Sequence, residues 1–260
     1  MADFLDVLVK DAEKIISEGY YEVEVESTSK KIVSLKDSIL KCKHAPVIAE
    51  IKPASPSHGK LRNILSLESV AKAIERGGAV GISVLTEPKH FEGSLNSLVE
   101  ARKNVNLPIL MKDIVIDKVQ IEAAAKTGAN VVLLISSVFE RGYVSYSLRE
   151  MIKFAHSKGL EVLLETHDKG QFLSALETEA DLVGVNNRDL KTLKVDLKVT
   201  ENVLCGVGKI SKVVVSESGV NDPSDILFLH GCGAHAFLVG SAVMLADNIE
   251  EKVRELVMAL

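Results

Sequence analysis

Residues 47–57 read VIAEIKPASPS: an apolar run ends in two opposite charges and then turns on two prolines. Its Val and Ile residues predict a buried strand. Because residues two apart in a strand share a face, Glu50 and Lys52 point the same way at its carboxyl end. In one isolated strand this pair would simply be a structural ion pair. The same pattern recurs along the chain, and the recurrence favours a functional interpretation, since buried charges are costly unless they are paired or used.

Short β-branched runs alternate with amphipathic stretches through the rest of the chain. We expect strands at 47–52, 81–87, 109–114, 130–136, 161–166, 182–188, 212–218 and 236–241. Helices are expected between them, for example at 66–76, 117–127, 146–158, 169–177 and 223–229, several with glycine cap signals (Gly77-Gly78, Gly128, Gly159, Gly231). This alternation predicts an α/β protein with a parallel sheet, and eight units favour a closed (β/α)8 TIM barrel over an open doubly wound sheet. A GxGxxG motif does not follow the first strand, which argues against a dinucleotide-binding fold.

The first 45 residues do not follow this alternation of strands and helices. Phe4, Leu8, Ala12, Ile15 and Ile16 form an apolar stripe at helical spacing, and a second helical run follows at 34–41. We expect a single barrel domain over residues 1–260. Residues 1–45 are expected to form an N-terminal helical extension that packs on one end of the barrel.

Composition excludes several classes of protein. A net charge of −5 over 260 residues argues against nucleic acid or an anionic membrane as a partner. Apolar runs stay below the ~18 residues that span a bilayer, and the acidic start lacks the pattern of a signal peptide. Cys42, Cys205 and Cys232 have the spacing of neither a disulfide framework nor a zinc site. We therefore expect a cytoplasmic protein, a monomer or weak homo-oligomer, that binds a small molecule.

Polar side chains stand at the carboxyl ends of the expected strands, where barrels of this kind carry their active sites. The candidates are Glu50, Lys52, Ser55, Lys112, Glu165, Asn186, Arg188 and Glu217. Such a set of ammoniums, carboxylates, a guanidinium and an amide can hold an anionic substrate while it transfers protons. The seven histidines are scattered, and His90 and His167, near strand ends, are expected beside the site. A metal centre is not expected.

Two glycine–serine pairs indicate a phosphate site. Ser218-Gly219 follows the seventh expected strand and Gly240-Ser241 follows the eighth. Many barrels bind phosphate there through backbone N–H groups, and glycine allows the anion to approach closely. Each pair alone is more often a turn, so the argument rests on their joint occurrence.

Six segments together resemble the indole-3-glycerol phosphate synthase family. They are 47–59 (VIAEIKPASPSHG), 110–114 (LMKDI), 163–166 (LLET), 183–190 (VGVNNRDL), 215–220 (VSESGV) and 237–244 (FLVGSAVM). The resemblance covers the chain from Pro46 to its carboxyl terminus, and the helical extension also fits. Two positions depart from the family pattern: His58 replaces the usual Lys, and Ile114 stands where Phe often follows Lys-Asp.

The resemblance implies a reaction of tryptophan biosynthesis. It is the ring closure of 1-(2-carboxyphenylamino)-1-deoxyribulose 5-phosphate, with loss of CO2 and water and without a cofactor. In this family, Lys112 is expected to protonate the ketone oxygen, and Lys52 to hold anionic groups and supply a second proton. Glu165, with Glu50, is expected to stabilise the iminium intermediate and take up the final proton. Which lysine acts at which step stays open.

The resemblance also implies binding roles. Asn186 and Arg188 position the substrate, Ser55 and Glu217 contact it, and Phe91 and Leu133 flank its aromatic ring. Ser218, Gly219, Gly240 and Ser241 bind the phosphate. Two alternatives remain: a Schiff-base aldolase that uses Lys112 or Lys52 as a nucleophile, and a catalytically silent barrel that serves as a binding partner.

Overall fold

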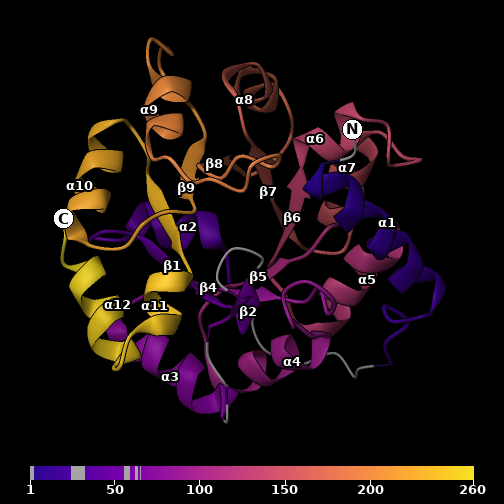
Figure 1. Cartoon of the computed structure of the whole chain (residues 1–260), viewed down its shortest axis with the longest axis horizontal. Helices are drawn as coiled ribbons and strands as arrows, with labels where there is room; N and C mark the ends of the chain where they lie inside the picture. Colours follow the sequence, from indigo (N-terminus) through magenta and orange to yellow (C-terminus); the bar gives the residue numbers. More distant parts are fainter. Residues whose placement is uncertain (1–2, 25–32, 56–58, 62–63, 65) are drawn as a thin grey trace.

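A closed barrel of parallel strands forms the centre of the molecule. The computed structural model describes residues 3–24, 33–55, 59–61, 64 and 66–260. Its barrel strands are β1 (Val47–Ile51), β4 (Gly81–Leu85), β5 (Ile109–Lys112), β6 (Val131–Ile135), β7 (Glu161–Thr166), β8 (Leu182–Asn186), β9 (Val213–Glu217) and β10 (Ala236–Val239). They follow one another around the ring, and β1 closes it by pairing with both β4 and β10 (Figure 1). The (β/α)8 TIM barrel is confirmed.

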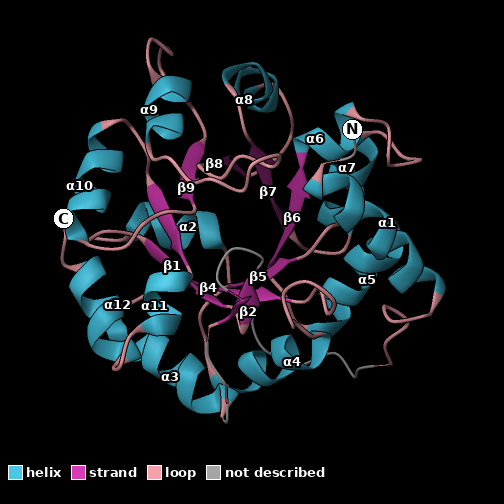
Figure 2. Cartoon of the chain, in the orientation of Figure 1, coloured by secondary structure: helices cyan, strands magenta, loops and turns pink. Residues whose placement is uncertain are grey.

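Helices surround this ring (Figure 2). They are α3 (Leu67–Gly77), α4 (Leu95–Asn104), α5 (Lys118–Thr127), α6 (Ser136–Glu140), α7 (Leu148–Ser157), α8 (Lys169–Leu176), α9 (Lys198–Leu204), α10 (Pro223–Gly231), α11 (Ser241–Leu245) and α12 (Ile249–Val257). Left-handed glycines end α3 and α5, at Gly78 and Gly128, as their sequences predict. After α10 the left-handed residue is Gly233 and not the expected Gly231, which is still helical. Among the helices of the described residues, none is long and apolar enough to span a membrane.

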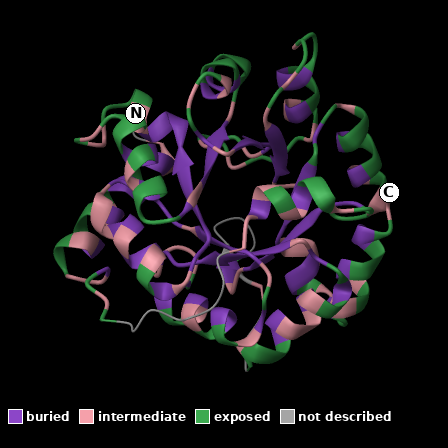
Figure 3. Ribbon diagram, turned by 180° about the vertical axis from the view of Figure 1, so that it is seen from behind, coloured by how far each residue is buried: buried purple, intermediate pink, exposed green. Residues whose placement is uncertain are grey.

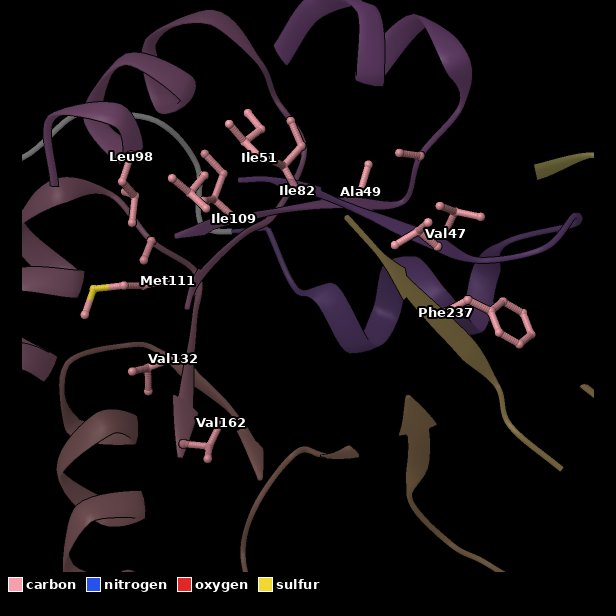
Figure 4. Packing of buried hydrophobic residues seen from close by; sticks show 14 of the residues in the cluster. Val47, Ala49, Ile51, Ile82, Leu98, Ile109, Met111, Val132, Val162 and Phe237 are labelled. Carbon is pink, nitrogen blue, oxygen red and sulfur yellow. The ribbon is translucent and has the colours of Figure 1, made fainter. Parts of the chain in front are cut away.

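The strands bury both faces, and their two faces build two cores. Outward side chains such as Val47, Ile82 and Ile109 pack against the helices (Figure 4). The alternate residues, such as Ile48 and Leu110, fill the inside of the barrel. The ring is buried while the helices expose their outer faces (Figure 3). Because residues alternate, the polar residues that continue the inward series arrive at the carboxyl end of the barrel interior.

The N-terminal extension covers both ends of the barrel, so the expectation of a single end is wrong. Helix α1 (Phe4–Ser17) places Leu5 and Leu8 at the mouth formed by the carboxyl ends of the strands. Helix α2 (Leu35–Lys41) lies at the opposite end, where Glu161, the first residue of β7, accepts hydrogen bonds from its first turn. Both helices add apolar side chains to the interior core. Both ends of the barrel leave some interior apolar side chains uncovered, and the extension packs on these side chains at each end.

Above β1, the chain forms a short antiparallel pair, β2 (Ala54–Ser55) with β3 (Gly59–Lys60). The barrel strands stop one or two residues before the expected ends at several points: β4 ends at Leu85, β5 at Lys112 and β8 at Asn186. Beyond these residues the chain no longer pairs with the neighbouring strands, and the polar side chains that follow can turn toward the opening at the carboxyl ends of the strands.

Candidate functional site

A cavity of about 520 Å³ opens at the carboxyl ends of the strands. Its lining includes most of the residues that the sequence singles out: Glu50, Lys52, Phe91, Lys112, Leu133, Glu165, Asn186, Arg188, Glu217, Ser218, Gly219, Gly240 and Ser241. They come from all eight βα units, so only the closed barrel brings them together.

Lys112 ends β5 inside this cavity, and two carboxylates hold its ammonium. Its Nζ lies 3.1 Å from Oε2 of Glu165 on β7 and 3.2 Å from Oε2 of Glu217 on β9. Burial by itself lowers the pKa of Lys112, but attraction to the facing carboxylates outweighs burial and raises that pKa above its ordinary value. Lys112 therefore carries its charge at neutral pH and can donate a proton.

The two carboxylates beside Lys112 differ in their affinity for protons. Burial raises the pKa of Glu165, but the charges of Lys112 and His167 and a hydrogen bond from Asn186 bring it below its ordinary value. Burial also raises the pKa of Glu217, and there the charge of Glu165 adds to it, so the pKa stays raised despite Lys112. Glu165 is the ionised member of the pair and can act as a base, while Glu217 can hold a proton.

Glu50 and Lys52 form the ion pair that their spacing predicts. Lys52 Nζ lies 3.0 Å from Glu50 Oε1, and the Ser83 hydroxyl donates to Glu50 Oε2 at 3.3 Å. Gly240 makes this pair possible, because a Cβ there would lie 2.7 Å from Glu50 Oε1 and 3.0 Å from Lys52 Nζ. The sequence assigns Gly240 only to phosphate, and its steric role emerges from the structure.

Asn186 is the last residue of β8 and Arg188 lies two residues beyond it. Their side chains face the same cavity, as alternation predicts. The Arg188 backbone N–H donates to Asn186 Oδ1 at 3.0 Å, and the Arg188 guanidinium donates to the carbonyl of Leu193 at 2.8 Å. Both residues line the cavity. The hydrogen bond to Leu193 therefore holds the guanidinium at the cavity wall.

The two candidate phosphate segments lie in the lining of the same cavity. Ser218 and Gly219 are both left-handed, with φ of +66° and +97°. Gly219 packs so closely that a Cβ would lie 2.6 Å from Val195 Cγ1 and 2.8 Å from Leu197 Cδ2. On the neighbouring unit, Gly240 precedes α11 and Ser241 begins it. The backbone amides of these segments are the kind of donor that phosphate needs.

Apolar side chains form other walls of the cavity. Phe91 and Leu133 line the cavity, as the family resemblance implies. Ile114, which departs from the family pattern, lines it too. The backbone of Ser55 lies in β2. His58 lies outside the described residues, so its effect on the site stays a prediction.

Several lining residues were missed at the level of sequence. Phe4, Leu5 and Leu8 reach the cavity from α1, and Val195 and Leu197 reach it from the segment before α9. The stripe of α1 is visible in the sequence, but an apolar stripe does not say which surface it covers. The segment before α9 shows no periodic signal.

The two histidines near strand ends lie beside the site and not among its lining residues. His167 Nε2 lies 3.3 Å from Glu165 Oε1 and contributes to the lowered pKa of that carboxyl. His90 pairs with Asp11 of α1 through Nε2 at 2.6 Å. Both positions agree with the supporting roles expected for them.

Comparisons with known proteins agree with this geometry. Residues 5–256 match the family described as indole-3-glycerol phosphate synthase. The chain is 39% identical over 252 residues to the indole-3-glycerol phosphate synthase of Methanocaldococcus jannaschii, covering 95% of this chain and 92% of that protein. It is 46% identical over 218 residues to that of Methanopyrus kandleri, covering 82% and 83%.

Solved structures agree on the fold. An N-acetylmannosamine-6-phosphate 2-epimerase from Clostridium perfringens covers 84% of this chain and 93% of its own, with a TM-score of 0.62 and 16% identity. Identity at that level shows a shared barrel and nothing about activity. The family match across the barrel and the relatives aligned over most of their length carry the assignment: the chain belongs to the indole-3-glycerol phosphate synthase family.

Proposed function

We propose that the mouth of this barrel closes the indole ring of 1-(2-carboxyphenylamino)-1-deoxyribulose 5-phosphate and releases indole-3-glycerol phosphate, CO2 and water. One observation carries the proposal: the Lys112 ammonium is held between Glu165 and Glu217 inside a cavity with apolar walls and left-handed Ser218-Gly219 at its rim. A fixed acid, a fixed base and an anion-binding segment are what the reaction needs.

The first step joins the ring carbon that bears the carboxylate to the ketone carbon. Negative charge then develops on the ketone oxygen, and the Lys112 ammonium donates its proton there. The ring nitrogen becomes an iminium cation, which the ionised Glu165 stabilises. Loss of CO2 returns the bonding electrons to the ring and neutralises the cation.

The last step removes water. The new hydroxyl leaves with a proton from an acid, and we assign this step to Lys52, whose ammonium pairs with Glu50. Glu165 takes a proton from the adjacent CH2 carbon, and the double bond of the indole forms. Asn186 and Arg188 hold the substrate in place during these steps, Ser218, Gly219, Gly240 and Ser241 bind the phosphate, and Ser55, Phe91, Leu133 and Glu217 complete its contacts.

The charge of Lys112 argues against the alternative of a Schiff-base aldolase. A nucleophilic lysine needs a lowered pKa, whereas the facing carboxylates raise the pKa of Lys112. Incubation of the purified chain with the ribulose phosphate substrate, followed by indole fluorescence, tests the proposal. We expect a product with indole fluorescence and no protein adduct after borohydride treatment. A borohydride-trapped adduct at Lys112, or absence of product, would contradict it.

We further propose that residues 1–260 form one domain, with 1–45 as its extension, which works in the cytoplasm as a monomer or weak homo-oligomer. The interior core supports one unit, because it combines side chains from α1 and α2 with those of the barrel strands. Exposed large apolar side chains are spread over several elements, including α1, α8 and α10. Sedimentation at micromolar concentration is expected to give mainly the mass of one chain.

A further inference from the structure

A buried polar cluster lies directly behind the left-handed Ser218. Its members are Asn187, which directly follows β8, Thr200 in α9 and Ser216 in β9, and each is at most 1% exposed. Of the described residues that line the cavity, none belongs to this cluster. The cluster therefore cannot touch a substrate, and its effect on the site has to pass through the residues it holds.

Thr200 fixes the orientation of the Asn187 amide. The Thr200 backbone N–H and hydroxyl both donate to Asn187 Oδ1, at 3.1 and 2.8 Å. The amide NH2 group must then face β9, where it donates to the Ser216 hydroxyl and to the Ser218 carbonyl, both at 3.0 Å. The reverse orientation would bring NH2 against the Thr200 N–H, so the network assigns a single amide orientation.

Ser218 needs such a partner because its backbone is strained. A φ of +66° is unfavourable for a residue that has a Cβ and persists only where the surroundings enforce it. Asn187 makes two hydrogen bonds at the end of β9. Its backbone N–H donates to the Glu217 carbonyl at 2.9 Å, and its side-chain amide donates to the carbonyl of Ser218. These two bonds fix the peptides on either side of the strained residue.

We propose that Asn187 is a positioning residue for phosphate binding, which holds Ser218 left-handed so that the amides of Ser218 and Gly219 face the phosphate before the substrate arrives. Thr200 acts through Asn187 by fixing its amide. This inference rests on the proposed function, because it takes Ser218-Gly219 as the phosphate segment. A segment that is already ordered loses less conformational entropy on binding, so the benefit appears as affinity.

The test compares Asn187→Ala with Asn130→Ala. Asn130 is also a buried asparagine, but it lies at the amino end of β6, where its Oδ1 accepts from Arg102 and from the backbone of Ile109. Both variants lose a buried amide, so both are expected to lower the melting temperature. For Asn187→Ala we expect KM, and the inhibition constant of inorganic phosphate as a competitor, to rise roughly tenfold. Its kcat should change less, and Asn130→Ala should leave both constants within twofold.

Substitutions of Thr200 give a second test, with smaller expected effects and a smaller risk of misfolding. Thr200→Val keeps the backbone donor to Asn187 but loses the hydroxyl donor, so it should raise both constants by a smaller factor. Thr200→Ser keeps the hydroxyl and should behave as wild type. If Asn187→Ala and Thr200→Val lower the melting temperature but leave KM and phosphate inhibition unchanged, the cluster is only structural and the inference is overturned.

The same experiment separates this inference from the proposed function. If phosphate competes with substrate in the wild-type chain but equally well in Asn187→Ala, the site is right and the role of Asn187 is wrong. If phosphate does not compete in the wild-type chain at all, the phosphate segment is misplaced and the inference fails with it. Indole formation by the wild-type chain tests the reaction independently of both.

Discussion

Two glycines inside the barrel leave the space that the charged side chains occupy. A Cβ at Gly184 would lie 2.1 Å from Oε1 of Glu217, and a Cβ at Gly240 would lie within 3.0 Å of both Glu50 and Lys52. These neighbours are the ends of flexible side chains, so a methyl group would displace the carboxylates more than the strands. Glycine at these two positions is a requirement of the site more than of the fold.

We therefore expect Gly184→Ala to damage catalysis more than stability. The new methyl group would push the Glu217 carboxylate away from Lys112, and a displacement of this kind can cost roughly 10²-fold in kcat. The matched control is Gly208→Ala, because a Cβ at Gly208 meets no described atom within 4 Å. Steady-state kinetics and thermal unfolding of both variants check this. An unchanged kcat in Gly184→Ala would show that the position of Glu217 is unimportant.

Lys112→Ala is expected to lower kcat by roughly 10²–10⁴-fold while substrate still binds, because one positioned general acid contributes about that much. Lys72→Ala is a suitable control, since Lys72 is a partly exposed helical residue that pairs only with Glu68 among the described residues. Single-turnover kinetics separate binding from chemistry. If Lys112→Ala turned over at the wild-type rate, the first proton donor would have to be reassigned, and Lys52 is the next candidate.

At the scale of elements, hydrogen bonds join the N-terminal extension to the strand ends that carry the site. The Tyr21 hydroxyl donates to Asp113 Oδ2 at 3.0 Å, and Thr86 donates to the same oxygen. The Tyr20 hydroxyl donates to the Thr86 carbonyl at 3.0 Å. Asp113 directly follows Lys112, so the segment after α1 holds the strand end that carries the proposed acid.

Burial of Asp113 makes stability depend on pH, and the hydrogen bonds from Thr86 and Tyr21 oppose this effect because they lower its pKa. Burial is the main reason that the pKa of Asp113 rises to about 6, against an ordinary value of 3.8. A raised pKa means that the folded state prefers the protonated carboxyl. This preference contributes stability below about pH 4 and loses it as pH rises to about 6. The shift corresponds to about 3 kcal/mol.

Asp113→Asn is expected to remove this dependence, because asparagine resembles the protonated acid at every pH. Urea unfolding at a series of pH values gives the difference in unfolding free energy between the wild type and the variant. The wild type should lose stability relative to the variant as pH rises from about 4 to 6. A difference that stays constant over this range would mean that Asp113 titrates normally.

The sequence predicts elements better than it predicts their neighbours. The eight strands were identifiable because runs such as Val131–Ile135 are rich in β-branched residues and lie between turn signals. The amphipathic stripe of α1 was equally visible. Apolar side chains are left uncovered at both ends of the barrel, however, and the spacing of a stripe does not say which end it covers. In the site, alternation placed Glu50 beside Lys52. The predicted barrel already makes β8 and β9 neighbours, but the hydrogen bond from the Asn187 side chain to the Ser218 carbonyl depends on the left-handed backbone of Ser218, which no local pattern reveals.

At the scale of the whole molecule, the first and last units of the barrel must meet. Strand β1 pairs with β10, and the Ala45 backbone N–H donates to the Val257 carbonyl at 3.0 Å. Outside the strands, α12 packs on α3 at Gly77, where a Cβ would lie 2.6 Å from Val253 Cβ and 3.0 Å from the Glu250 carbonyl oxygen. Unlike the glycines inside the barrel, Gly77 faces atoms that a helix holds rigidly. Closure of the ring therefore depends on this close approach.

Gly77→Ala is accordingly expected to destabilise the entire molecule by roughly 1–3 kcal/mol, the usual cost of overpacking. In a chain of this size, the melting temperature should fall by roughly 2–4 °C per kcal/mol. The matched control is Gly231→Ala: Gly231 also ends a helix, α10, and a Cβ there meets no described atom within 4 Å. That change should be neutral or stabilising, because alanine favours helix more than glycine does. Unfolding followed by circular dichroism and by activity should give the same lowered midpoint for Gly77→Ala, since an opened ring exposes the cavity together with the core. A midpoint equal to that of Gly231→Ala would show that α12 can move aside, and that the pairing of β1 with β10 closes the barrel without it.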